Sequence, residues 1–395
     1  MNKYLLVINA GSSSIKFAIY QKDTATLQLI ANAAGQIEEI GNQPRFTVKT
    51  PDAVILVDRT PSVDEAQDHA SAIKLILNWL WVYLADGILL AVGHRVVHGG
   101  QHYSVPVLIN ETVLAELETL IPLAPLHQSH NLATIRALLD IKPSLPQVAC
   151  FDTAFHHTQP QVAQRFALPH HFVDEGIRRY GFHGLSYEYI TSVLPSLDPA
   201  LTNARVIVAH LGSGASLCAL YKGNSIATTM GFSPLDGLVM GTRCGNIDAG
   251  VLLYLMDHYN MDARALENLL YHQSGLLGVS GISNDMRTLL ASDDPQAHEA
   301  IELFVYRTGR EIGSLVAALG GLDALVFTGG IGEHSATIRS RISHHAMWLG
   351  LKLDDWANET GASFISTEGS KVSAWIIATD ENLMIAKHTL QYITF

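Results

Sequence analysis

The alternation of apolar and polar residues at the start of the chain predicts two strands joined by a tight turn. In residues 7–17 (VINAGSSSIKF), an apolar run ends at Asn9, small residues follow, and a second extended segment carries Lys16. An apolar run bounded by turn-forming residues is typical of a buried strand. We therefore expect a strand, a turn with little side-chain bulk, and a second strand.

The same pattern returns in residues 206–221 (VIVAHLGSGASLCALY), about half a chain further on. At one fixed offset, identical residues coincide: Val7 with Val208, Gly11 with Gly212, Ser12 with Ser213, Ala18 with Ala219 and Tyr20 with Tyr221. The repetition indicates two related domains, each presenting a phosphate-binding turn to one cleft. A chance similarity between two ordinary hairpins is the alternative.

The rest of the chain alternates between strand and helix patterns, which is typical of an α/β fold. Residues 30–60 are expected to be irregular, apart from β-prone runs at 46–48 and 53–57. Further strands are predicted at 88–92, 147–151, 325–328 and 375–378, and helices at 64–85, 111–121, 129–140, 249–259, 262–271, 296–319 and after 382. The strand at 325–328 is expected to enter a glycine turn at 329–332,. We place one domain at residues 1–150 together with a C-terminal helix at 383–395, and the other at 151–382.

Composition narrows the class of protein. The chain has 395 residues and a formal net charge of −12, so we expect no nucleic-acid partner, because binding a nucleic acid needs a basic face. Residues 75–92 are mostly apolar but contain polar interruptions, which favours a buried helix and strand over a membrane span. Three cysteines without a CxxC pair indicate reduced thiols, and we expect a cytoplasmic protein.

The first hairpin carries groups suited to a polyphosphate. If residues 12–16 are extended, Ser12, Ser14 and Lys16 share one face and offer two hydroxyls and an ammonium. Asn9 offers a carbonyl oxygen to a hydrated Mg²⁺. A serine-rich turn with an exposed lysine is the simpler interpretation. The motif GxxxxGK[ST] is absent and GxGxxG fails at residues 212–214, so nucleotide binding would use the paired hairpins.

Two arginines and an aspartate lie at predicted strand ends or in glycine-rich loops. Arg95 and Arg243 each lie near glycines, and the planar guanidinium suits carboxylate and phosphoryl oxygens. A structural ion pair is the alternative for both. Asp152 follows an apolar strand and could orient an arginine, act as an acid or base, or cap a helix.

Histidines and a late glutamate add further candidates. His127, His183 and His210 lie in loops flanked by glycine or proline and could donate to a phosphoryl group, although each could also be structural. The segment HRVVH lacks the glutamate of HExxH, which argues against zinc. Glu381 could complete a Mg²⁺ site with Asn9 or stand at a helix start.

Ten motifs, taken in order, resemble the acetate kinase (acetokinase) family of short-chain carboxylate kinases, in the sugar kinase/Hsp70/actin superfamily. They are NAGSSSIKF, GHRVVHGG, PLAPLH, FDTAFH, YGFHG, HLGSGAS, GFSPLDGLVMGTRCG, SNDMR, FTGGIGE and TDEN. The resemblance implies two duplicated actin-like ATPase (ribonuclease H-like) domains with a nucleotide cleft between them. It also implies a homodimer and a reversible, in-line, Mg²⁺-dependent phosphoryl transfer between ATP and acetate, giving ADP and acetyl phosphate; Mn²⁺ can replace Mg²⁺.

The resemblance also implies roles for individual residues. Mg²⁺ would contact Asn9 and Glu381, the acetate carboxylate would contact Arg95, and the catalytic groups would be Asp152, His183 and Arg243. A small apolar pocket for the acyl methyl group would be lined by Val97, Leu126, Phe182 and Pro234. The nucleotide would contact Ser12, Ser14, Lys16, His210, Leu211, Gly212, Ser213, Gly214, Asp285, Met286, Arg287, Gly330, Ile331, Gly332, Glu333 and His334.

The sequence departs from the family pattern at several positions beside these groups. Ser213 replaces the usual asparagine of HLGNG, and His334 replaces the asparagine of GGIGEN, which leaves the nucleotide base preference open. Leu185 and Tyr187 replace the threonine and histidine of YGFHGTSH and could change the support of His183. Asn246 stands where an acidic residue is usual, close to Arg243.

Two alternative functions stay open from the sequence. A propionate kinase of the same family differs by one methylene in the acyl group, which an apolar pocket distinguishes only weakly. A non-catalytic nucleotide protein belongs to a different class: as a switch it predicts the absence of the arginine pair, and as a sensor it predicts the loss of Asp152 or Arg243. All three residues are present.

Overall fold

The computed structural model describes residues 1–23, 26 and 28–393, and the chain divides into two compact units. Unit 1 consists of Met1–Ala154 together with the chain from Asp380 onward, and unit 2 consists of Phe155–Thr379. The boundaries expected after residues 150 and 382 lie a few residues from these divisions. Residues 394–395 of the expected C-terminal helix lie outside the described residues.

Unit 1 is built on an eight-stranded sheet with the order β5-β4-β3-β2-β1-β6-β8-β7. Strands β1, β2 and β3 are antiparallel neighbours, whereas β6 is parallel to β1 and β8 is parallel to β6. The strands are β1 (Lys3–Ala10), β2 (Ile15–Lys22), β3 (Leu29–Glu38), β4 (Arg45–Lys49), β5 (Ile55–Arg59), β6 (Ile88–Val96), β7 (Val107–Leu108) and β8 (Gln147–Phe151).

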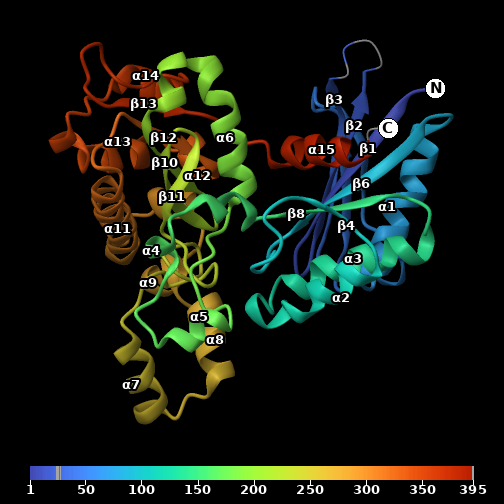
Figure 1. The fold of residues 1–395 in the computed structure, drawn as a ribbon, viewed down its shortest axis with the longest axis horizontal. Helices are drawn as coiled ribbons and strands as arrows, with labels where there is room; N and C mark the ends of the chain where they lie inside the picture. Colours follow the sequence, from blue (N-terminus) through green and yellow to red (C-terminus); the bar gives the residue numbers. More distant parts are fainter. Residues whose placement is uncertain (24–25, 27, 394–395) are drawn as a thin grey trace. The chain divides into compact units, whose positions relative to one another are not determined.

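Helices cover both faces of this sheet. The helices are η1 (Val63–Ala66), α1 (His69–Leu84), α2 (Glu111–Thr119), η2 (Ile121–Leu123), α3 (Gln128–Ile141) and α15 (Glu381–Tyr392). The apolar face of α1 packs with Leu6 and Ile8 of β1 in one core cluster. Helix α15 lies on the opposite side of the sheet (Figure 1), where a Cβ at Gly93 would come within 2.2 Å of Thr389 Oγ1. The glycine therefore permits the close packing of β6 on α15.

Unit 2 is built on a five-stranded sheet with the order β11-β10-β9-β12-β13. Strand β10 is antiparallel to β9 and β11, whereas β12 is parallel to β9 and β13 is parallel to β12. The strands are β9 (Arg205–Leu211), β10 (Ala215–Tyr221), β11 (Asn224–Thr228), β12 (Ala324–Thr328) and β13 (Ser373–Ile376).

The helices of unit 2 are arranged around this sheet (Figure 1). Helix α6 packs its buried residues Tyr187, Ile190 and Leu194 against β9, β10 and β12. The helices are α4 (Gln161–Gln164), α5 (His170–Asp174), α6 (Gly184–Leu197), η4 (Pro199–Asn203), α7 (Ala249–Tyr259), α8 (Ala263–His272), α9 (Gly275–Ser280), α10 (Met286–Leu290), α11 (Pro295–Leu319), α12 (Gly329–His334), α13 (Ala336–His344), η5 (Met347–Leu349) and α14 (Asp355–Thr360), and η3 (Ala154–Thr158) spans the division between the units.

The two sheets share one topology. In unit 1 the order β3-β2-β1-β6-β8 has the same pattern of strand directions as β11-β10-β9-β12-β13 in unit 2. The hairpins differ in one detail, however: Val7 pairs with Ala18, whereas Val208 pairs with Cys218. The second turn is therefore one residue shorter. The fixed offset that aligned Ala18 with Ala219 and Tyr20 with Tyr221 is wrong beyond the turn.

Three other expectations are corrected. Residues 30–60 are not irregular, because β3 pairs along its length with β2; its small and polar residues hide the strand pattern. Strand β2 begins at Ile15, so Ser12 and Ser14 lie in the turn and do not share a strand face with Lys16. Residues 329–334 form a short helix rather than a glycine turn. None of the helices in the described part of the chain is long and apolar enough to cross a membrane.

Candidate active site

The guanidinium of Arg95 is the centre of a polar cluster in unit 1. Its Nε donates to Asp152 Oδ1 at 2.9 Å, and its Nη2 donates to Asp152 Oδ2 at 2.5 Å. Its Nη1 donates to Asn9 Oδ1 at 3.2 Å. The Asp152 side chain is 3% exposed, whereas that of Arg95 is 23% exposed. The arginine is thus held on one side by a buried carboxylate and keeps an accessible part.

The strand order explains why these residues meet. Strands β1, β6 and β8 are parallel neighbours, and Asn9, Arg95 and Asp152 all lie at or just beyond the same end of them. Burial lowers the pKa of Arg95, but the charge and hydrogen bonds of Asp152, together with the charge of Glu381, raise it by more. The guanidinium is therefore permanently charged. The helix N-cap interpretation of Asp152 does not account for this pair.

Sequence reasoning missed a buried amide that joins two of these strand ends. Asn131 of α3 is 2% exposed. Its Nδ2 donates to Ala10 O at 2.7 Å, and its Oδ1 accepts from Val97 N at 3.0 Å. Two further polar residues on the same buried stripe, Gln128 and Thr134, follow a helical spacing of three. That spacing is the signal that could have found Asn131 in the sequence.

The first hairpin turn is closed by its backbone. Gly11 N donates to Ser14 O at 2.8 Å, and His69 Nε2 lies 2.7 Å from Gly11 O. Lys16 and Asn9 are paired directly across the hairpin, so their side chains lie on the same face of the sheet. Ser12 and Lys16 are exposed. The hairpin therefore presents the Ser12 hydroxyl of its turn and the Lys16 ammonium of β2 at the surface.

In unit 2, His183 stands at the start of α6 with its side chain tied to the second hairpin. Its Nδ1 lies 2.8 Å from Ser216 Oγ, and Tyr187 Oη lies 2.5 Å from the same oxygen. The ring of His183 stacks on that of His210 with centroids 4.3 Å apart, and Ser186 Oγ lies 2.9 Å from His210 Nδ1. His183 itself has a left-handed backbone, with φ 58°.

Arg243 approaches the same part of unit 2. A Cβ at Gly214 would lie 2.9 Å from Arg243 Nη2 and 3.2 Å from His183 Nε2. The two nitrogens therefore face one point beside the second hairpin turn, and glycine keeps that point open. Arg243 Nη1 donates to Pro234 O at 2.6 Å, so the loop that carries Pro234 fixes the direction of the guanidinium.

The predicted nucleotide residues of unit 2 lie in three segments. Residues 210–214 end β9 and form the hairpin turn. In α12, Gly330 is exposed, whereas Glu333 Oε1 accepts from Gly329 N at 2.8 Å and from Thr379 N at 3.3 Å. Glu333 thus supports the backbone. The side chain of Asp285 caps α10 and pairs with exposed Arg287.

The expected acyl-pocket residues are divided between the units. Val97 is buried and Leu126 half-buried in unit 1, while Phe182 and Pro234 are buried in unit 2. A separate cavity of about 250 Å³ in unit 2 is lined by Arg179, Thr228, Asp236, Asn246, Glu311 and Ser314, among others. None of the predicted site residues lines it.

Comparison with known proteins decides the family. The profile described as the acetokinase family matches residues 4–387. The chain belongs to the acetokinase family. A protein named acetate kinase from Rhodopseudomonas palustris (strain ATCC BAA-98 / CGA009) is 56% identical over 98% of both chains. Another from Methylocella silvestris is 50% identical over 99% of this chain and 98% of that one.

Solved structures agree with this assignment. A propionate kinase from Francisella tularensis superposes with a TM-score of 0.90 at 39% identity, covering 98% of each chain. An acetate kinase from Porphyromonas gingivalis has a TM-score of 0.87 at 35% identity, covering 99% of this chain and all of the other. The acetokinase resemblance, the duplicated actin-like ATPase fold and the assignment as a kinase that acts on a carboxylate are confirmed.

Proposed function

We propose that this acetokinase transfers a phosphoryl group reversibly between ATP and acetate, in line and with Mg²⁺, giving ADP and acetyl phosphate. The observation that carries the proposal is the guanidinium of Arg95, which Asp152 orients from one side while part of it stays accessible. A planar cation held in this way suits a small carboxylate.

The chemistry explains why Asp152 acts as an orienting group. Acetate is already an anion at neutral pH, so one of its oxygens attacks the γ-phosphorus while the bond from that phosphorus to the ADP oxygen breaks. No proton has to move. Both Asp152 oxygens accept hydrogen bonds from Arg95, so the carboxylate is arranged to orient the guanidinium. We therefore assign Asp152 to the positioning of Arg95 rather than to acid–base catalysis.

The donor set at the strand ends fits a Mg²⁺ ion. Asn9 supplies an amide oxygen whose second lone pair remains after it accepts from Arg95,. Glu381 supplies a carboxylate that acts on Arg95 through its charge, so both ligands belong to one neighbourhood of unit 1. Mg²⁺ prefers such oxygen ligands and keeps several waters. When bound, the ion would neutralise charge on the phosphate oxygens, and Mn²⁺ could take its place.

Residues of unit 2 would stabilise the transferring group. His183 and Arg243 face one point beside the hairpin turn, and cations and N–H donors there would meet the charge on the equatorial phosphoryl oxygens. The nucleotide would be bound by the segments 210–214, 285–287 and 330–334. Lys16, Ser12 and Ser14 would contact its phosphates from the first hairpin.

The acyl preference is proposed to be acetate, with propionate as the second candidate. The similarity to a solved propionate kinase at 39% identity supports the second candidate. A coupled ATP assay across formate, acetate, propionate and butyrate tests both. We expect the highest kcat/KM with acetate. A higher kcat/KM with propionate would make propionate the preferred substrate and acetate the second candidate. Equal and negligible turnover on all four would remove the kinase proposal.

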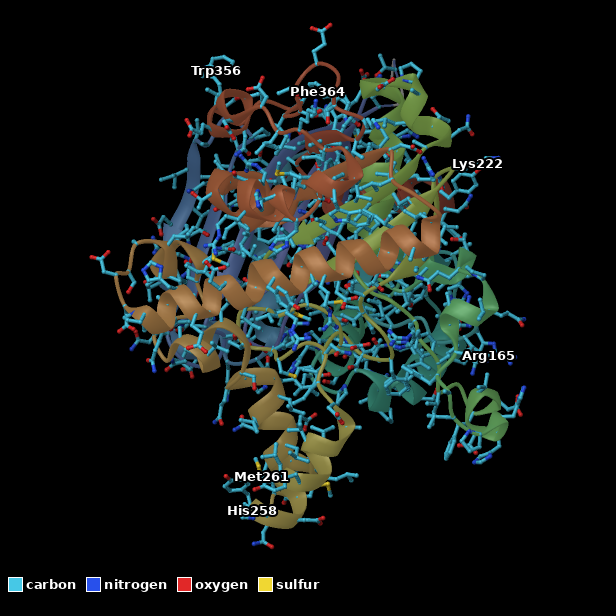
Figure 2. All side chains as sticks on the ribbon, turned by 90° about the vertical axis from the view of Figure 1, so that its left-hand side faces the viewer. Arg165, Lys222, His258, Met261, Trp356 and Phe364 are labelled. Carbon is cyan, nitrogen blue, oxygen red and sulfur yellow. The ribbon has the colours of Figure 1, made fainter. Side chains whose placement is uncertain are left out.

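We also propose a homodimer in the cytoplasm. Helix α7 has no buried residue, and its exposed apolar side chains are Val251, Leu253, Tyr254, Met256 and Tyr259. Figure 2 shows His258 and Met261 at the end of the projecting segment that α7 and α8 form. An apolar helix of this kind is usually covered, and a second copy is the commonest partner. Light scattering should give twice the mass of 42.9 kDa, and Leu253→Glu should give the mass of one chain.

The cytoplasmic location is supported by the cysteines. The three cysteines, all within the described residues, form no disulfide, which suits a reducing compartment.

A further inference from the structure

We propose that Tyr187 and Ser216 are positioning residues that hold His183 in the tautomer with its proton on Nε2. The inference rests on the phosphoryl-transfer role proposed above for His183. It concerns Tyr187, which stands where the family usually has histidine. In this chain the Tyr187 hydroxyl would therefore help to fix which nitrogen of His183 carries the proton.

The contacts form a continuous line of three polar groups. Tyr187 Oη lies 2.5 Å from Ser216 Oγ, and Ser216 Oγ lies 2.8 Å from His183 Nδ1. Tyr187 and Ser216 are both 0% exposed, so water does not compete for these groups. Buried hydrogen bonds in such a chain strengthen one another.

The backbone fixes the two ends of the line. Tyr187 N donates to His183 O at 3.1 Å, which places the tyrosine one turn of α6 after the histidine. Ser216 is paired with His210 across the second hairpin. His183 adopts a left-handed backbone that residues other than glycine rarely adopt,. The histidine is therefore held where helix and hairpin meet.

The donor order follows from the chemistry of the groups. A phenol is a better donor than acceptor, since its oxygen lone pair is shared with the ring, whereas a serine hydroxyl both donates and accepts. Burial raises the pKa of Tyr187 well above its usual value, and the neighbouring Cys218 raises it further, so the phenol keeps its proton. Tyr187 then donates to Ser216, and Ser216 donates to His183 Nδ1. The proton of a neutral imidazole must consequently lie on Nε2.

This tautomer is the one that the reaction needs. His183 Nε2 faces the same point as Arg243 Nη2, beside Gly214. An N–H at that atom donates to a phosphoryl oxygen, whereas a bare lone pair would repel it. The hydrogen bonds from Tyr187 through Ser216 to His183 form a relay. This relay makes His183 Nε2 a hydrogen-bond donor without any proton transfer.

Three substitutions test the relay. Tyr187→Phe removes only the hydroxyl, Ser216→Ala removes the link itself, and Ser216→Thr keeps a hydroxyl at the same place. Tyr189→Phe, two residues along the same helix, is the matched control. We expect kcat to fall roughly tenfold in the first two, with the KM for acetate unchanged. Ser216→Thr should restore part of the loss, and Tyr189→Phe should match the wild type.

The decisive readout is the pair of ¹⁵N shifts of His183, measured by NMR without substrates. The wild type should show a protonated Nε2 and an unprotonated Nδ1, and Tyr187→Phe should show a mixture of tautomers. A wild-type spectrum and wild-type kcat in Tyr187→Phe would overturn the inference. Because the shifts need no turnover, they still test the relay if no carboxylate proves to be a substrate. If Tyr187→Phe fails to fold, Ser216→Ala gives the same comparison.

Discussion

Arg95 and Asp152 are 57 residues apart in the sequence and form a three-contact pair, because Val96 and Phe151 are register partners in the parallel strands β6 and β8. The pair places a buried carboxylate behind a partly exposed guanidinium. Under the proposed function, that arrangement makes an arginine at a strand end the receptor for a carboxylate.

Asp152→Asn should leave Arg95 charged but less well oriented. The amide keeps the shape of the carboxylate and loses the charge and one acceptor oxygen. We expect the KM for acetate to rise and kcat to fall, together by roughly 10²-fold in kcat/KM. Steady-state kinetics with acetate varied at saturating ATP would measure it. A normal KM for acetate, with kcat alone reduced, would instead indicate acid–base catalysis by Asp152.

Arg95→Ala and Arg243→Ala should affect different kinetic constants. Arg95→Ala should mainly weaken carboxylate binding and so raise the KM for acetate. Arg243→Ala should lower kcat by roughly 10³-fold, since it removes a cation from the developing charge. The same assays compare the two variants, and exposed Arg310 supplies a control as Arg310→Ala. Unchanged kinetics in Arg243→Ala would remove that residue from the mechanism.

Asn131→Leu should destabilise unit 1. The substitution leaves Ala10 O and Val97 N without the partners that the amide provides. Buried unsatisfied groups of this kind cost about 1–3 kcal/mol each, so we expect the free energy of unfolding to fall by about 2–4 kcal/mol. Urea denaturation followed by circular dichroism would measure the loss. Ser129→Ala, on the same helix, is the control; an equal loss there would contradict the role of the amide.

Stability should fall as the pH is lowered below about 6.5. Burial lowers the pKa of His94 to about 4, partly opposed by its hydrogen bond to Gln147. The unfolded chain then binds a proton at about pH 5 that the folded chain does not, so unfolding becomes easier as the pH falls from about 6.5 towards 4. His94→Gln should lose about 2 kcal/mol less than the wild type between about pH 7 and pH 5. Equal losses, measured by urea denaturation, would contradict this assignment.

The sequence pattern predicts much of the fold for clear physical reasons. Helices α7 and α11 and strand β8 match the predicted ranges closely. Helix α11 has a clear apolar periodicity, and α7 and β8 are runs of apolar residues with polar residues at their ends. Strand β3 escapes prediction because its core-facing positions are few. The alignment of the two hairpins at one fixed offset fails beyond the turn because the second turn is one residue shorter. Nothing in the residues of the turn reveals this difference in length.

The site is partly predictable in the same way. Arg95 and Asp152 could be placed together because both follow apolar runs, and parallel strands end at one edge. The relay from Tyr187 to His183 could not be predicted, since it requires knowing that α6 starts at Gly184 and that Ser216 faces it. The spacing of four between His183 and Tyr187 is the only trace of it in the sequence.

The most direct test of the proposed carboxylate kinase chemistry is a ³¹P NMR spectrum of the purified chain with ATP, Mg²⁺ and acetate. We predict a growing acetyl phosphate resonance, matched by the conversion of ATP to ADP, and its loss at the same acetate concentration in Arg95→Ala. ATP conversion that yields only inorganic phosphate, or an acetyl phosphate signal undiminished in Arg95→Ala, would contradict the role assigned to Arg95.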